Sequence, residues 1–174
     1  MNKINRKRFL TSIAVISGAS LMPNKIFPFQ SQDEPKGPID KNVVHEFVKV
    51  SHNDFDRAKE ILSKYPHIIN SAWDWGDGDF ETAIGAAGHM GHRDYALYLI
   101  SQGARTDVFV LAMLGQTEIV KSMLSQYPNL LNSLGPHGFT LLHHAKQGKE
   151  HSAELYEFLQ SKGLKETIVK IYKK

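Results

Sequence analysis

Nine histidines are the residues of this chain with the most obvious chemical potential. Imidazole binds transition metals, but metal sites on helices often show a pattern such as His-Glu-x-x-His. His89 and His92 flank a glycine turn instead, and the later histidines lack the pattern too: His137, His143, His144 and His151. We therefore interpret the histidines as turn and capping residues, and we predict no metal ligand and no cofactor.

A short acidic segment resembles a calcium loop, because Asp74-Trp75-Gly76-Asp77-Gly78-Asp79 places carboxylates at alternate positions. An EF-hand loop also needs a glycine at its sixth position and a glutamate at its twelfth. Neither residue stands at the required place here. The segment therefore predicts a loop and no calcium site.

Other catalytic signatures are absent from the sequence. The chain has no cysteine, which excludes disulfides, thiolate zinc sites and a cysteine nucleophile. It also lacks a nucleophile elbow, a phosphate loop and a dinucleotide fingerprint. We predict that the protein is not an enzyme. The alternative is a hydrolase that uses His143 or His144 with a carboxylate.

The N-terminal residues read as an export signal. A basic stretch precedes an apolar stretch from Phe9 to Met22, as in signal peptides. Asn5-Arg6-Lys7-Arg8-Phe9-Leu10 resembles the twin-arginine motif, with Lys7 in place of the second arginine, so the general secretory route is the alternative. We predict a signal over 1–22, a proline-rich linker over 23–40 and a periplasmic or otherwise exported protein. An uncleaved signal would act as a membrane anchor.

The net positive charge of the chain comes from this signal. Four of the 21 basic residues lie within it, at Lys3, Arg6, Lys7 and Arg8, and no acidic residue accompanies them. The remainder holds 17 basic and 18 acidic residues. A nearly neutral domain gives no electrostatic reason to expect a nucleic-acid partner.

The rest of the chain contains an internal repeat of two short apolar helices joined by a turn. The turns are centred on Asn53, Gly91, Gly115 and Gly148, at spacings of 38, 24 and 33 residues. An isolated pair of such short helices is unstable, whereas stacked pairs bury a continuous core. The sequence therefore predicts an all-α solenoid of about four helix-turn-helix units over 41–164. The segment 165–174 is expected to be a capping helix or a basic tail.

Two of these units resemble the ankyrin repeat. The second unit has Thr82-Ala83-Ile84-Gly85-Ala86-Ala87 and ends on Gly103-Ala104, and the fourth has Gly138-Phe139-Thr140-Leu141-Leu142-His143. The resemblance implies short hairpin loops between units, with structural roles for Thr82, Gly91, Gly103, Gly115, Thr140 and His143. It also implies a non-catalytic protein-binding module. We expect a monomer with a protein partner and no membrane contact beyond the signal; the alternative is an accessory protein for a co-exported enzyme.

The hairpin tips are the expected contact surface, because exposed aromatic side chains anchor interfaces. Asp77 and Asp79, near the tip of the first hairpin, are expected to be exposed. Packing of one or both tryptophans over the core is the alternative to their exposure. The candidate partner-binding residues are Trp73, Trp75, Asp77, Asp79, Phe80, Pro136, His137 and Phe139.

Overall fold

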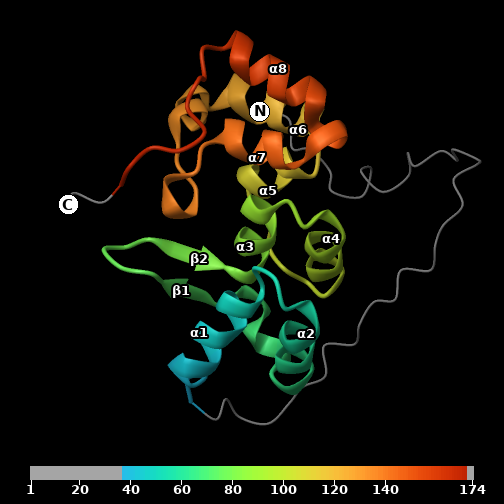
Figure 1. The fold of residues 1–174 in the computed structure, drawn as a ribbon, viewed down its shortest axis with the longest axis vertical. Helices are drawn as coiled ribbons and strands as arrows, with labels where there is room; N and C mark the ends of the chain where they lie inside the picture. Colours follow the sequence, from blue (N-terminus) through green and yellow to red (C-terminus); the bar gives the residue numbers. More distant parts are fainter. Residues whose placement is uncertain (1–36, 172–174) are drawn as a thin grey trace, which may run out of the picture. The chain divides into compact units, whose positions relative to one another are not determined.

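The computed structural model describes residues 37–171. The predicted signal and most of the predicted linker lie outside this range. Within it the chain is mostly helical, as the sequence predicted, with one two-stranded hairpin (Figure 1). The helices and strands are α1 (Lys41–Val50), α2 (Phe55–Lys64), β1 (Ala72–Asp74), β2 (Phe80–Thr82), α3 (Ala83–Met90), α4 (Arg93–Ser101), α5 (Val108–Met113), α6 (Thr117–Gln126), α7 (Leu141–Gln147) and α8 (Ala153–Ser161).

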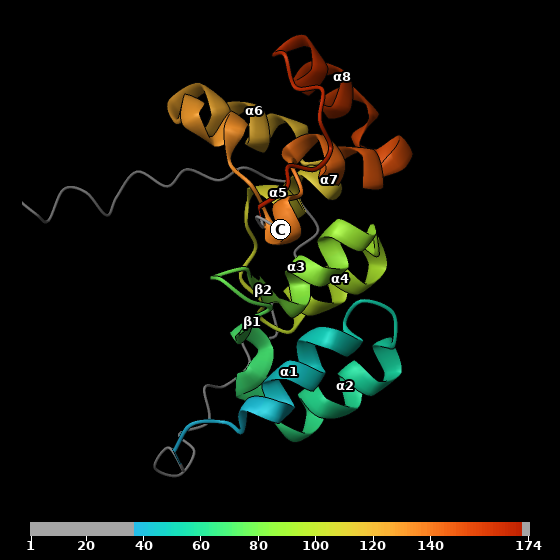
Figure 2. The ribbon, with the colours of Figure 1, turned by 60° about the vertical axis from the view of Figure 1, so that its left-hand side comes forward.

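The helices form four consecutive pairs. Each odd-numbered helix packs against the helix that follows it, and α1, α3, α5 and α7 also contact one another in sequence order (Figures 1 and 2). Short 3₁₀ helices fill the connections: η2 (Pro66–Asn70), η3 (Pro128–Asn132), η4 (Pro136–Gly138) and η5 (Lys149–Ser152). No helix in the described range is long and apolar enough to cross a membrane.

Side-chain caps determine where several helices begin. Thr82 accepts a hydrogen bond from the backbone N–H of Gly85, and Thr140 accepts one from that of His143, as the sequence predicted. Asp107 caps α5 in the same way through the N–H groups of Phe109 and Val110. Each cap satisfies N–H groups that the first helical turn leaves without a partner.

Glycines at two of the turns permit the chain to reverse between paired helices. Gly91 follows α3 with φ 76° and Gly115 follows α5 with φ 73°, a left-handed conformation that favours glycine. The turn after α7 differs, because Gly148 has φ −73° and Lys149 takes the left-handed conformation instead. Gly103, after α4, is also left-handed.

Two groups of buried apolar side chains make up the core. One lies around α1 to α5 and includes Phe47 and Leu99; the other lies around α5 to α8 and includes Leu142 and Leu155. Helix α5 contributes side chains to both groups, with Met113 in the first and Ala112 in the second. The pairs therefore share one continuous packing arrangement, although each helix is short.

The segment after α8 is not the helix that we considered for 165–174. Its described part pairs with the loop that precedes α7: Thr140 N–H donates to the Thr167 carbonyl, and Val169 N–H donates to the Gly138 carbonyl. The Thr140 hydroxyl also donates to the Glu166 carbonyl. Three consecutive β-branched residues, 167–169, favour this extended pairing over a helix.

Candidate functional site

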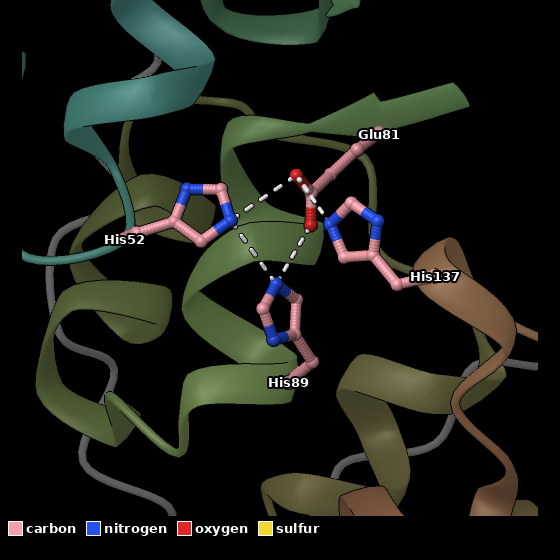
Figure 3. Close-up of side chains that lie close together, drawn as sticks. All are labelled: His52, Glu81, His89 and His137. Atoms are coloured by element: carbon pink, nitrogen blue, oxygen red, sulfur yellow. Dashed lines mark hydrogen bonds and ion pairs between the residues drawn. The ribbon is translucent and has the colours of Figure 1, made fainter. Parts of the chain in front are cut away.

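Four side chains that are far apart in the sequence meet beside strand β2 (Figure 3). They are His52 from the turn after α1, Glu81 from β2, His89 from α3 and His137 from η4. One ligand atom from each of them lies within 4.8 Å of all the others. We call this group the His-Glu cluster.

The distances within the His-Glu cluster are short. Glu81 Oε1 lies 2.8 Å from His89 Nε2, and Glu81 Oε2 lies 3.3 Å from His52 Nε2 and 3.5 Å from His137 Nε2. His52 Nε2 and His89 Nε2 are 3.2 Å apart. Three imidazoles therefore present their Nε2 atoms to a single carboxylate.

The hairpin places Glu81 in this position. Residues alternate between the two faces of a strand, and Trp73 pairs directly with Glu81 in the antiparallel register. Glu81 points inward and is 1% exposed, whereas its neighbour Phe80 points outward and is 62% exposed. The same alternation turns Asp79 inward with Glu81.

The other ring nitrogens of two histidines are held by acceptors. His52 Nδ1 lies 3.1 Å from the carbonyl oxygens of Val48 and Lys49, and His137 Nδ1 lies 2.8 Å from Asp79 Oδ2. Carbonyl and carboxylate oxygens accept hydrogen bonds, so each Nδ1 carries the proton and donates it. In the neutral ring this leaves the Nε2 lone pair directed at the centre of the cluster.

The two oxygens of Glu81 have different environments. Oε2 accepts a 2.8 Å hydrogen bond from Trp75 Nε1, whereas the polar contact of buried Oε1 is the 2.8 Å approach of His89 Nε2. Burial would raise the pKa of Glu81, but the imidazoles of His52 and His89 lower it to about 2. The contact with Glu81 in turn raises the pKa of His52, against the effect of burial. The carboxylate of Glu81 is therefore charged at neutral pH.

Asp79 contradicts our expectation that it is exposed. It is 7% exposed, and its carboxylate accepts hydrogen bonds from both the backbone N–H and Nδ1 of His137, each 2.8 Å long. His137 has φ 60°, an uncommon conformation for a residue other than glycine. The two bonds from Asp79 help to hold the ring of His137 at the cluster despite this backbone strain.

The spacing of the histidines along the sequence did not predict the His-Glu cluster. Its members come from the first, second and fourth helix pairs, so no local motif connects them. One signal was present. Strand alternation over Asp79, Phe80 and Glu81 places two carboxylates on the face opposite the phenylalanine, and that face adjoins an apolar helix.

The tryptophans lie near the same cluster. Trp75 is half-buried, donates to Glu81 and has its ring 6.0 Å from those of His52 and His137. Trp73 is also half-buried, with its ring centroid 4.6 Å from that of His45 on α1. The inward packing that we considered as the alternative to exposure therefore applies in part to both residues.

Three of the remaining predicted contact residues, Asp77, Phe80 and Pro136, border a groove of about 490 Å³, whereas Phe139 stacks on His143 instead. The hairpin forms one wall through Asp77 and Phe80, and Pro136 lies in the opposite wall. The start of α5, at Asp107 and Phe109, also lines the groove. Between the two walls the third helix pair contributes no strand, since residues 103–107 pass directly from α4 into α5.

The histidines of α7 have structural contacts. His143 Nε2 lies 2.9 Å from the carbonyl oxygen of His89, and its ring stacks on Phe139 with centroids 3.9 Å apart. His144 is 1% exposed, and its Nδ1 donates to the Thr140 carbonyl at 2.9 Å. Burial lowers the pKa of His143, and it lowers the pKa of His144 to about 4. These positions favour a role in packing over the hydrolytic role considered above.

Comparison with known proteins adds no functional assignment. No protein-family model matches the chain, and no curated protein matches it in sequence.

Proposed function

We propose that this protein is an ankyrin-repeat module that binds a protein partner in the groove between its hairpin and the loop before α7. The observation that carries the proposal is the exposure of Phe80, which lines the groove at the hairpin and is 62% exposed. Exposed aromatic side chains beside a concave surface are typical anchor points for protein interfaces.

The ankyrin part of the proposal rests on the arrangement of the helix pairs. Successive pairs stack through their first helices, threonines cap α3 and α7, and left-handed glycines follow α3 and α5. Side-chain bonds also connect neighbouring pairs, as where His92 Nε2 lies 2.8 Å from the carbonyl oxygen of His52. These features agree with the resemblance of the second and fourth units to the ankyrin repeat.

The chemistry of the groove indicates what its partner presents. Its apolar lining includes Phe80, Phe109, Leu134, Pro136 and Ile171, and its charged lining residues are Asp77, Asp79 and Asp107. No lysine or arginine lines it in the described part of the chain. Charge complementarity therefore favours a protein segment in which an apolar side chain stands next to a basic one.

Selection from a displayed library of random peptides on the immobilised full chain tests this proposal. We expect the selected peptides to share an apolar residue beside lysine or arginine. Phe80→Ser should weaken the binding of these peptides by roughly tenfold or more, as expected for an interface anchor. Ile119→Ser is the matched control, because Ile119 is exposed on α6 outside the groove. Peptides that bind Phe80→Ser as well as wild type would contradict the groove as the binding surface.

We also propose that the protein works outside the cytoplasm. The basic and apolar segments within 1–22 support export, although they lie outside the described residues. Fusion of residues 1–40 to a reporter that is active only after export tests this. Activity should depend on the basic residues at 6–8, and an inactive fusion that accumulates in the cytoplasm would refute it.

A further inference from the structure

We propose that the His-Glu cluster is a structural binding site for a divalent transition metal ion of the Zn²⁺ type. The ligands would be Nε2 of His52, His89 and His137 together with the carboxylate of Glu81 (Figure 3). The site is separate from the groove function, and either proposal can fail without the other.

The spacing of the ligand atoms fits a four-coordinate ion. Zn²⁺ binds histidine nitrogen and carboxylate oxygen at about 2.0–2.2 Å, so ligand atoms at the corners of a tetrahedron lie roughly 3.3 Å apart. Glu81 Oε1 lies 2.8 Å from His89 Nε2, and Glu81 Oε2 lies 3.3 and 3.5 Å from Nε2 of His52 and His137. The Nε2 atoms of His52 and His89 are 3.2 Å apart, and one ligand atom from each of the four residues lies within 4.8 Å of the others. Small side-chain rotations would bring all four atoms to one centre.

The buried carboxylate is the second observation that points to a cation. Glu81 is 1% exposed, and in the described part of the chain its Oε1 makes no hydrogen bond apart from its 2.8 Å contact with His89 Nε2, itself a candidate ligand. A buried acceptor of this kind is unfavourable unless an ion or a donor satisfies it. A cation at the centre of the cluster would satisfy this oxygen and the three nitrogen lone pairs together.

The groups behind the ligands have the arrangement found around metal-bound histidines. Such rings usually donate their other N–H to a carboxylate or a backbone carbonyl, which fixes the ring and its tautomer. His137 Nδ1 donates to the carboxylate of Asp79, and His52 Nδ1 donates to the backbone carbonyls of Val48 and Lys49. Trp75 holds Glu81 through Nε1. Three of the four ligands are therefore oriented from outside the cluster.

The number of protein ligands favours a structural site over a catalytic one. Catalytic zinc usually has three protein ligands and a water molecule, whereas structural zinc is closed by four. The four ligands here join the first, second and fourth helix pairs, and the side chains of His52 and His137, 20% and 30% exposed, leave the ion a path to enter. The third pair lacks a hairpin, which lets the loop carrying His137 reach β2.

Metal titration of the chelator-treated full chain tests the site directly. We expect one Zn²⁺ ion per chain by calorimetry, a higher melting temperature with Zn²⁺, and visible absorption typical of four-coordinate Co²⁺ when Co²⁺ is used. His89→Gln should abolish the Co²⁺ spectrum. Asp79→Asn, which changes the carboxylate that accepts from Nδ1 and the backbone N–H of His137, should weaken Zn²⁺ binding by roughly 10–100-fold.

His67→Gln and His151→Gln are the matched controls, because both histidines are exposed and lie outside the cluster. Circular dichroism of the metal-free variants establishes that each is folded. Retained Zn²⁺ binding by folded His89→Gln, or equal losses in the control variants, would overturn the proposal. Absence of stoichiometric Zn²⁺ binding by the wild-type chain would overturn it as well.

Discussion

The buried histidine of α7 leads to a specific loss of stability in mild acid. His144 is 1% exposed, and burial lowers its pKa from the ordinary 6.5 to about 4. The folded chain keeps this ring neutral, whereas the unfolded chain protonates it near its ordinary pKa. The contribution to stability is therefore complete above the unfolded pKa and is lost as the pH falls toward the folded one.

The size of this effect follows from the two pKa values. Each unit of difference corresponds to about 1.36 kcal/mol, so the free energy of unfolding should fall by about 2.5 kcal/mol between about pH 7.5 and pH 4.5 on account of His144 alone. Urea unfolding at both pH values, in the presence of a metal chelator, measures it.

Comparison with a variant isolates the contribution of this ring. His144→Asn retains an N–H donor for the Thr140 carbonyl but does not titrate. Between the two pH values its free energy of unfolding should therefore fall by about 2.5 kcal/mol less than that of the wild type. His151→Asn, at an exposed position, should behave like the wild type. An equal dependence on pH in the wild type and His144→Asn would refute the argument that burial keeps the ring neutral.

Three further substitutions, two of them paired with a control variant, test the fold by urea unfolding. Gly115→Ala should destabilise the chain by more than about 1 kcal/mol, because the left-handed backbone disfavours alanine and the new Cβ would meet a backbone carbonyl of the fourth helix pair. Gly103 is also left-handed but has open space around it, so Gly103→Ala should destabilise the chain less. Leu155→Ala should lower the free energy of unfolding by about 2–5 kcal/mol, and exposed Leu97→Ala by much less, or the core assignment is wrong. Thr140→Ala should cost about 1 kcal/mol through the lost cap of α7, and an unchanged midpoint would contradict that role.

The helices were readable from the sequence because their signals are local. Apolar spacing and threonine caps at Thr82 and Thr140 predicted where α3 and α7 begin, and glycine predicted the turns at Gly91 and Gly115. The segment after α8 was harder to predict. Its apolar spacing suggested a helix, but hydrogen bonds to Gly138 and Thr140, distant in sequence, stabilise an extended conformation instead.

The His-Glu cluster could not be predicted in the same way, because it depends on how the pairs stack. His52 and His137 lie on turns of different pairs, and the described third pair between them contributes no strand that would separate η4 from β2. The face on which Asp79 and Glu81 lie could have been read from strand alternation. Which histidines lie beside these two carboxylates could be known only from the three-dimensional arrangement of the helix pairs.

Site-specific photocrosslinking in the producing cell tests the proposed protein-binding function most directly. A benzophenone side chain at Phe80, in the wall of the groove, is compared with one at Tyr127, which is equally exposed but lies outside the groove lining. The account predicts one discrete protein adduct from position 80 and none from position 127, with the adduct suppressed by an excess of a peptide selected on the groove. No adduct at position 80, or the same adduct from both positions, would contradict it.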